Sequence, residues 1–323
     1  MSVTISTPSR LHFGLLRFEQ AEGPSFGGLG MMIAEPRTIA RLSPANAWQT
    51  SGVDAERAET HARRALEHIS VAGAPRAIPH AFRVKVLESI PPHQGLGSGT
   101  QLALAVAAGV RTLCGIPAAS AEELAAMVGR GRRSAIGCHG FVRGGLLYEL
   151  GSYPAEPLGR LARRVELPSA WRVVLITASS AAGLSGDHEL NAFDQLPPVP
   201  AATTQRLERL AEAAILPAAE QGDFETFGEA LFEYGRLAGE CFASVQGGPY
   251  ASDEIAACVG TLRELGVRGV GQSSWGPTVF AMAADEASAN EIVGQMRGIS
   301  AWRDHAMRIT QPDNHGAQTA TAS

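Results

Sequence analysis

The segment PPHQGLGSGTQ, residues 91–101, constrains the fold of this chain more than any other. Before it, Phe82, Val84 and Val86 alternate with charged residues, which predicts a strand with one buried face. After it, the run LALAVAAGVRTL predicts a helix that ends near Gly115. The glycines allow close backbone approach where unpaired N–H groups and the helix dipole meet. A strand–loop–helix unit of this kind predicts an anion site.

The loop suits phosphate or pyrophosphate, although a plain turn is the competing interpretation. It lacks the Gly-Lys-Ser/Thr ending of a Walker A loop, and its G-x-G-x-G spacing is not that of a dinucleotide fingerprint. The hydroxyls of Ser98 and Thr100 add donors at the start of the helix. The predicted phosphate-binding or pyrophosphate-binding residues are Gly95, Leu96, Gly97, Ser98, Gly99, Thr100 and Gln101.

Composition limits the partners of this site. The chain has 323 residues, which favours two domains, and 45% hydrophobic against 18% charged residues, which is enough for a core. The net charge is -5, and we see no Lys/Arg-rich block, so a nucleic-acid footprint is not expected. An anionic substrate must then be held by a few placed cations and by backbone amides.

The location predicted from the sequence is the cytoplasm. The N-terminal residues MSVTISTPSR have no apolar run of the kind a secretion signal needs, and no stretch approaches the ~18 apolar residues of a membrane span. The four cysteines are scattered, without a C-x-x-C pair, which favours free thiols in a reducing compartment.

Strands and helices are mixed in both halves, which predicts an α+β fold. We expect strands at Val3–Ile5 and Trp171–Thr177, and a capping box at Ser120 with Glu123. The predicted domains are residues 1–168 and 169–323, and we expect disorder from about residue 312. The helices expected from periodicity cover 55–70, 203–221, 224–243, 253–265 and 286–296.

Three segments, in order, resemble the landmarks of the GHMP kinases. They are TPSRLHFGLL (7–16), PPHQGLGSGTQ (91–101) and GVGQSSWGPTVFA (269–281). The resemblance implies a two-domain GHMP-kinase-like fold, with an N-terminal ribosomal-S5-like domain and a C-terminal ferredoxin-like α/β sandwich.

The chain departs from the kinase pattern where those kinases usually carry an Asp. The matching stretch, SAIGCHGFVRGG (134–145), has no acidic residue, and the Asp position falls at Gly137 or Cys138. One branch of the superfamily, the β-ribofuranosylaminobenzene 5′-phosphate synthases, is similar in this respect. The segments that carry this closer resemblance are RLHFGLL, FGGLG, HQGLGSGTQ, RSAIGCHGF, LSGDHELNAFDQLPP, GQSSWGP and DNHGA, while Arg17 departs from that branch.

The resemblance implies a decarboxylating phosphoribosyltransferase. It would condense phosphoribosyl pyrophosphate with 4-aminobenzoate or 4-hydroxybenzoate to give β-ribofuranosylaminobenzene 5′-phosphate or its phenol analogue, CO2 and pyrophosphate, early in methanopterin biosynthesis. Mg²⁺ is the expected cofactor and a homodimer the expected assembly. A small-molecule kinase using ATP is the main alternative, and a non-catalytic binding protein is a third.

Candidate site residues follow from the three landmarks. The catalytic candidates are Arg10, His12 and His139. The competing interpretation is a surface ion pair for Arg10 and a structural role for each histidine. Asp187 and Glu189 are either Mg²⁺ ligands or part of a solvated loop, and His188 lacks the partner of a zincin site. The substrate-binding candidates are Gly27, Gly28, His93, Gly271, Gln272, Ser273, Ser274, Trp275 and Gly276.

Overall fold

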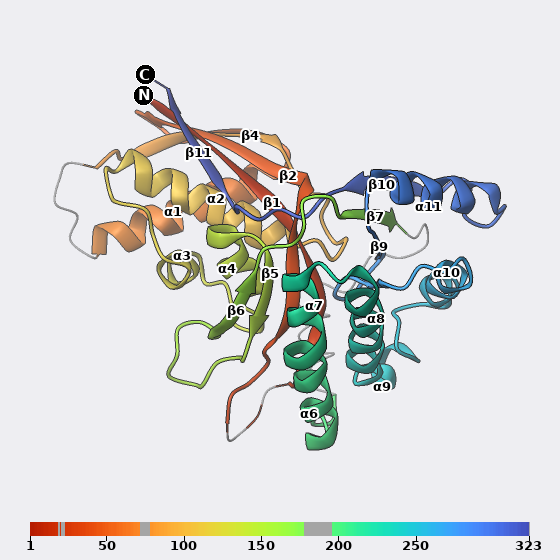
Figure 1. The fold of residues 1–323 in the computed structure, drawn as a ribbon. Coiled ribbons are helices and arrows are strands. Elements are labelled where there is room, and N and C mark those ends of the chain that lie inside the picture. The colour runs from red at the N-terminus through yellow and green to blue at the C-terminus, as the bar shows by residue number, and fades with distance from the viewer. Residues whose placement is uncertain (19, 21–22, 72–77, 178–195, 323) are drawn as a thin grey trace.

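The computed structural model describes residues 1–18, 20, 23–71, 78–177 and 196–322. Within these ranges the strands form a seven-stranded and a four-stranded sheet, with helices packed on both (Figure 1). The predicted Asp187, His188 and Glu189 lie outside the described residues.

The larger sheet runs in the order β11-β1-β2-β4-β3, and β5 and β6 extend it from β2. The strand expected at Val3–Ile5 is part of a longer strand, β1, which pairs along its length with β2. Neighbouring strands are antiparallel except for β3 and β4. The strands are β1 (Ser2–Leu15), β2 (Gly28–Ala45), β3 (Gln49–Gly52), β4 (Ala81–Glu88), β5 (Leu146–Glu149), β6 (Leu161–Val165) and β11 (Gln318–Ala322).

Helices α1 (Ala55–Val71), α2 (Ser98–Leu113), α3 (Ala121–Val128) and α4 (Ile136–Arg143) pack against this sheet (Figure 1). The predicted 55–70 helix, the half-buried strand before the loop and the helix after it are confirmed. The capping box at Ser120 is also confirmed, because its hydroxyl accepts from Glu123 N–H while the Glu123 carboxylate accepts from Ser120 N–H.

The smaller sheet has the order β10-β7-β9-β8, and its central strands β7 and β9 are buried on both faces. Along β7, Val174 and Ile176 join a cluster with α10 and α11, while Val173 and Leu175 point to a cluster with α7 and α8. The prediction of a fully buried strand here is therefore confirmed. The elements are β7 (Arg172–Thr177), β8 (Val270–Gln272), β9 (Thr278–Ala283), β10 (Ala306–Thr310), α6 (Ala201–Leu210), the π-helix η1 (Ala211–Ile215), α7 (Leu216–Gln221), α8 (Phe224–Glu240), α9 (Ala243–Gln246), α10 (Asp253–Glu264) and α11 (Glu286–Gly298).

The chain passes from the larger to the smaller sheet between Val165 and Arg172. One hydrophobic cluster nevertheless contains residues of both sheets, for example Leu11 of β1 and Phe280 of β9. The division into two domains after residue 168 stays a prediction, because the two sheets share this core.

The expectation of disorder from about residue 312 is wrong. Strand β11 pairs antiparallel with Ser2–Ser6 at the edge of the larger sheet, so both termini lie together in Figure 1. The Asp313 carboxylate accepts from His315 N–H (2.9 Å) and Gly316 N–H (2.7 Å), and Asn314 bridges the backbone of Leu167. The side chains of β11 are exposed, so hydrophobic periodicity carries no signal for a strand that is held by its backbone.

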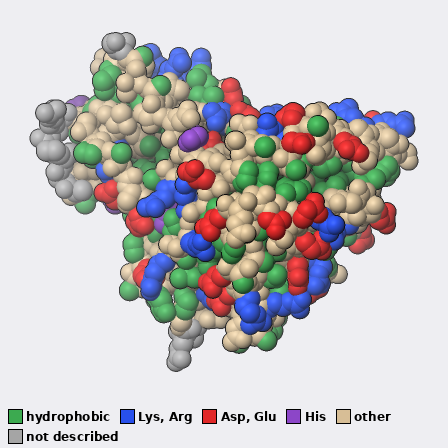
Figure 2. Space-filling view, viewed as in Figure 1, with side chains coloured by type: hydrophobic (Ala, Val, Ile, Leu, Met, Phe, Trp, Pro, Cys, Tyr) green, Lys and Arg blue, Asp and Glu red, His purple; other side chains and the backbone are tan. Residues whose placement is uncertain are grey.

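No helix in the described ranges is long and apolar enough to cross a membrane. On the face shown in Figure 2, acidic and basic side chains are interspersed over the helices in the lower part of the molecule. Exposed ion pairs of this kind include Arg206 with Glu233 and Arg163 with Glu220.

Candidate active site

Strand β1 joins the two glycine loops. Arg10 N–H donates to Leu96 O (3.0 Å), and Ser274 N–H donates to His12 O (3.0 Å). The Ser273 hydroxyl accepts from His12 N–H (3.1 Å) and donates to Gly95 O (2.8 Å). Because one strand holds both loops, they face the same cleft, whose volume is about 1190 Å³.

The first loop leads into an uncapped helix N-terminus. Gly97 is the N-cap of α2 at φ 78°, a left-handed conformation that favours glycine, and no side chain caps the helix. A Cβ at Gly97 would lie 3.3 Å from the Cβ of Arg10, so a side chain there would press on Arg10. The free N–H groups of the first turn and the helix dipole therefore make this end of α2 attractive to an anion.

Arginines gather around this helix end. A Cβ at Gly99 would lie 2.9 Å from Arg57 Nη2 and 3.5 Å from Arg130 Nη2, so both guanidinium groups reach the first turn. Burial, then the charge of Arg57 and of other arginines, lowers the pKa of Arg130. Burial, and then the charges of Arg130, Arg57 and Arg64, lowers the pKa of His61 to about 4. This region therefore has a positive potential that an anion would relieve.

These arginines were missed at the sequence level. Arg130, Arg132 and Arg133 stand together in the segment GRGRRS (129–134), a local basic run, contrary to our statement that the chain has no such block. Arg57 comes from α1, far away in the sequence, and only folding brings it to the cleft.

Asp54 is the only carboxylate among the described residues that line the cleft. It pairs with Arg57 (3.2 Å) and accepts a hydrogen bond from the Ser89 hydroxyl (3.3 Å). Its charge is therefore already engaged by neighbours.

A second carboxylate lies just behind the cleft. Glu149, at the end of β5, is fully buried, and its Oε2 accepts from Ala135 N–H (2.6 Å) at the start of α4. Burial raises its pKa to about 7, against the lowering effect of Ser134, Ala135 N–H and Arg10. The stretch 134–145 itself has no acidic residue, but the fold brings the carboxylate of Glu149 from β5 next to its first residues.

His12 contacts this region from the cleft. Its Nε2 lies 3.1 Å from Ser134 Oγ. Burial, and then the charge of Arg10, holds its pKa well below the usual value. His12 is therefore a neutral imidazole at pH 7, with one ring nitrogen that can accept a proton or a hydrogen bond.

Trp275 of the second loop and the nearby rings of Phe242, Phe26 and Tyr250 form an aromatic wall of the cleft. Trp275 packs edge-on against Phe242, with ring centroids 4.7 Å apart, and Phe242 packs on Phe18. Gln272 holds the loop in place, because it accepts from Ala251 N–H (2.8 Å) and donates to Ser274 O (2.7 Å). Phe26 and Tyr250 also line the cleft. The wall offers rings that an aromatic ligand can pack against.

Most of the predicted residues meet in this cleft, but several do not. Those that line it are Arg10, His12, His93, Gly95, Leu96, Gly97, Ser98, Gly99, Thr100, Gln272, Ser274, Trp275 and Gly276. Those outside its lining are Gly27, Gly28, Gln101, His139, Gly271 and Ser273.

The residues outside the lining have packing roles. Gln101 is buried and links Thr7 to the carbonyl of Gly137, and Ser273 joins the two loops. A Cβ at Gly28 would lie 2.5 Å from Gly14 O, so that glycine permits the close pairing of β1 and β2.

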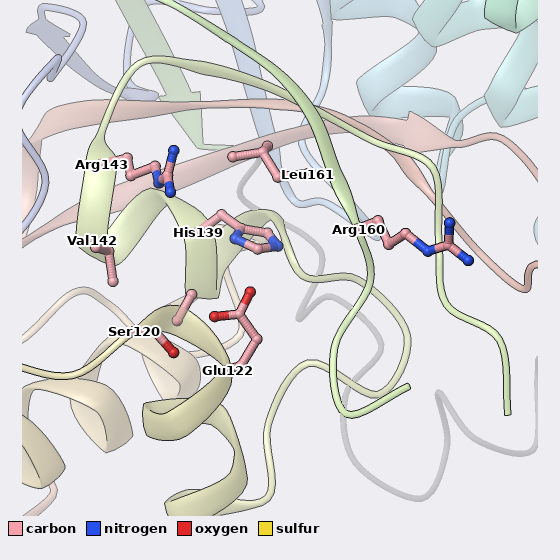
Figure 3. A pocket seen from close by; sticks show the side chains of 8 residues that line it. Ser120, Glu122, His139, Val142, Arg143, Arg160 and Leu161 are labelled. Atoms are coloured by element: carbon pink, nitrogen blue, oxygen red, sulfur yellow. The ribbon is translucent and has the colours of Figure 1, made fainter. Parts of the chain in front are cut away.

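His139 belongs to a separate hollow of about 340 Å³. Its Nε2 hydrogen-bonds to Gly159 O (2.8 Å), and Figure 3 shows it among Glu122, Arg143 and Arg160. The structure does not bring His139 to the cleft, so it gives no support to the catalytic role predicted for it.

Comparisons with known proteins agree on one family. The GHMP kinases N terminal domain matches residues 60–145, and the GHMP kinases C terminal family matches residues 215–299. The chain is 30% identical over 312 residues to a beta-ribofuranosylphenol 5'-phosphate synthase of Methanothermobacter thermautotrophicus, covering 90% of this chain and 91% of that protein. It is 28% identical to a protein of the same name from Archaeoglobus fulgidus, covering 97% and 98%.

Solved structures share the fold. A homoserine kinase from Cytophaga hutchinsonii superposes with a TM-score of 0.71 at 13% identity, covering 99% of this chain and 97% of the other. Mevalonate-3-kinase from Thermoplasma acidophilum gives 0.69 at 13% identity, covering 100% and 99%. The expected two-domain GHMP-kinase-like α+β fold is confirmed.

Proposed function

We propose, since this chain belongs to the beta-ribofuranosylphenol 5'-phosphate synthase family of the GHMP-kinase fold, that it is a decarboxylating pentosyltransferase. It condenses phosphoribosyl pyrophosphate with 4-hydroxybenzoate or 4-aminobenzoate and releases CO2 and pyrophosphate, in methanopterin biosynthesis. The observation that carries the proposal is the cleft itself. A helix N-terminus flanked by arginines faces an aromatic wall, and the one carboxylate lining the described cleft is already ion-paired.

The donor is an anion at both ends, with pyrophosphate on C1 and phosphate on C5. The N-terminus of α2 with Arg57 and Arg130 suits the pyrophosphate, which needs many donors at once. Arg132 and Arg133 line the same cleft and add positive charge for the second phosphate. A single phosphate would not need this number of cations.

The acceptor is a benzoate, and its ring packs on the aromatic wall. Trp275, Phe242 and Tyr250 supply flat apolar surface on the second-loop side of the cleft. Arg10 lies next to the first loop and has the fork geometry that suits a carboxylate.

The reaction needs positioning more than a strong base. The C1–O bond to pyrophosphate breaks, and C1 of the ribose becomes oxocarbenium-like. The ring carbon that bears the carboxylate attacks C1, and CO2 then leaves so that the ring regains aromaticity. The cleft's tasks are to stabilise the departing pyrophosphate, align the ring and keep water from the cation.

Mg²⁺ is part of the proposal, as an ion carried by the donor's phosphates. No group of three or more His, Cys, Asp or Glu that could hold a metal exists within the described ranges. Mg²⁺ commonly keeps several waters and uses one or two protein ligands beside phosphates, so Asp54 would serve, together with the Ser98 hydroxyl, by exchanging its pairing with Arg57 for the ion. Its charge would neutralise the diphosphate. The homodimer and the cytoplasmic location remain predictions.

Among the described residues, the kinase alternative finds no free carboxylate at the cleft for the acceptor hydroxyl. Asp54 is paired with Arg57, and Glu149 is buried behind Ser134. The two solved structures compared above are kinases, but at 13% identity they speak for the fold alone.

The test is an assay with carboxyl-labelled acceptor. With phosphoribosyl pyrophosphate and Mg²⁺, the protein should release labelled CO2 and pyrophosphate in equal amounts, and no CO2 without the ribosyl donor. With ATP and the same acceptor it should form no ADP. Pyrophosphate release with the label retained would indicate a phosphoribosyltransferase that attacks through nitrogen or oxygen, and ADP formation with a sugar or isoprenoid alcohol would support the kinase.

A further inference from the structure

Ser134 sits between a residue of the cleft and a buried carboxylate. It is half-buried just before α4, and its Oγ lies 3.1 Å from His12 Nε2. The same oxygen accepts a hydrogen bond from Ile136 N–H (3.3 Å). The carboxylate of Glu149, which accepts from the neighbouring Ala135 N–H, is close enough that Ser134 lowers the pKa of that group, although no hydrogen bond of normal geometry joins the two side chains.

Glu149 is held but not saturated. Its Oε2 accepts from Ala135 N–H (2.6 Å), whereas its buried Oε1 has no hydrogen-bond partner of normal geometry among the described residues. A buried carboxylate with an open acceptor oxygen draws the nearest hydroxyl hydrogen toward itself. Ser134, which precedes Ala135 and acts on the pKa of Glu149, supplies that hydroxyl.

The direction of each hydrogen bond then follows from counting hydrogens. Ser134 has one hydroxyl hydrogen, and Ile136 N–H already donates to its oxygen. If the hydrogen goes to Glu149, Ser134 Oγ can only accept from His12 Nε2. The hydrogen of the neutral imidazole is then on Nε2, and Nδ1 carries a lone pair. Within the described part of the chain, Nδ1 makes no hydrogen bond.

We propose that Glu149 is a positioning residue which, through Ser134, fixes His12 in the Nε2–H tautomer, so that Nδ1 is the proton acceptor for the substituent of the aromatic substrate. The identity of that proton donor, a phenolic O–H or an aniline N–H, rests on the proposed function. The tautomer itself does not.

The step balances as follows. As ring carbon attacks C1 of the ribose and pyrophosphate leaves, the O–H or N–H proton moves to Nδ1 and its electron pair enters the ring, giving a cross-conjugated ring that still bears the carboxylate. The bond to the carboxylate then breaks, CO2 leaves, and its electron pair restores the aromatic ring. The proton returns from Nδ1 to the oxygen or nitrogen, so His12 ends as it began.

Nitrogen NMR of the free protein reads the tautomer directly. With ¹⁵N-histidine at pH 8.5, above the pKa of about 7 of Glu149, His12 should show a protonated Nε2 and an unprotonated Nδ1. The signals are assigned by their loss in His12→Asn. In Glu149→Gln the amide oxygen can keep the contact with Ala135 N–H while the amide donates to Ser134. The serine hydrogen then points to His12, and the two nitrogen signals should exchange character.

Ser134 variants separate this from a purely structural role of Glu149. Ser134→Ala keeps the bond from Ala135 N–H to Glu149 but breaks the chain, and should give a mixture of tautomers. Ser134→Thr keeps the hydroxyl and should restore the wild-type signals. We expect Glu149→Gln and Ser134→Ala each to lower kcat about 100-fold, the low end of general acid–base contributions, with KM for phosphoribosyl pyrophosphate within about threefold.

Unchanged His12 signals in Glu149→Gln would overturn the tautomer assignment. Exchanged signals with unchanged kcat would overturn the proton-acceptor role. If the wild-type protein shows the expected His12 signals but turns over none of the proposed substrates, the proposed function is refuted. The control of the tautomer by Glu149 would still stand in that case.

Discussion

A methyl group at Gly99 should separate binding from stability. The residue lies in the first turn of α2, and an added Cβ would be 2.9 Å from Arg57 Nη2 and 3.5 Å from Arg130 Nη2. Ordinary contacts between such atoms are about 3.5–4.0 Å, so the Arg57 head must retreat by roughly 1 Å. The end of a flexible side chain can do this at little cost to the fold.

The cost falls on the anion. A hydrogen bond to a charged group contributes about 1.5–3 kcal/mol, so misplacing one guanidinium should weaken binding by roughly 10- to 100-fold. Meanwhile Gly→Ala within a helix stabilises by about 0.5–1 kcal/mol. Gly99→Ala should therefore bind pyrophosphate and phosphoribosyl pyrophosphate more weakly, with an unfolding free energy equal to or above that of wild type.

Calorimetric titration and denaturant unfolding measure both quantities. Gly294→Ala is the matched control, because Gly294 is an exposed glycine in α11 with nothing within 4 Å of an added Cβ. It should share the gain in stability and leave binding unchanged. If Gly99→Ala binds pyrophosphate within twofold of wild type, the anion does not lie between the α2 N-terminus and these arginines.

Three further changes test other parts of the site. Arg130→Gln should weaken pyrophosphate binding by at least about 10-fold and flatten its salt dependence, since a charged donor is lost. The control Arg206→Gln, at an exposed ion pair, should change neither quantity. If titrations at two salt concentrations show the same effect for both variants, the anion does not bind at Arg130. The unfolding free energy of Glu149→Gln should rise relative to that of wild type by about 3 kcal/mol between pH 4.5 and pH 8. The raised pKa of about 7 means that the folded wild type binds a proton more tightly than the unfolded chain does, and this contribution to its stability is lost as the proton leaves. A difference in denaturant unfolding that does not vary with pH would mean that the carboxyl is not perturbed. His139→Gln should leave kcat/KM unchanged, since His139 lies in the separate hollow, and a loss beyond about tenfold in steady-state kinetics would return it to the catalytic group.

Local patterns predicted much of the fold correctly. The loop of residues 95–101, the buried strand ending at Thr177 and the cap at Ser120 each depend on neighbours within a few residues, which a sequence displays directly. Strand β11 was missed because its only signal is backbone pairing with the start of the chain, and its side chains are exposed.

The site was predicted in outline but not in its charges. Arg10, His12 and both loops follow from motifs, whereas Arg57 and Glu149 lie on separate elements that only the fold brings beside them. The GRGRRS run carried a visible signal that we did not weigh. The sequence placed His139 in the cleft because its motif neighbour Gly137 lies beside Thr100 and Arg10. The His139 side chain instead points from α4 into the separate hollow, where it bonds to Gly159 O.

The most direct measurement of the central claim is electron density in crystals soaked with phosphoribosyl pyrophosphate and Mg²⁺. We expect a diphosphate at Gly97–Gly99, in contact with Arg57 and Arg130, with the ribose directed toward His12. A diphosphate bound elsewhere, for example in the hollow around His139, or a cleft that binds ATP and excludes the ribosyl donor, would contradict it.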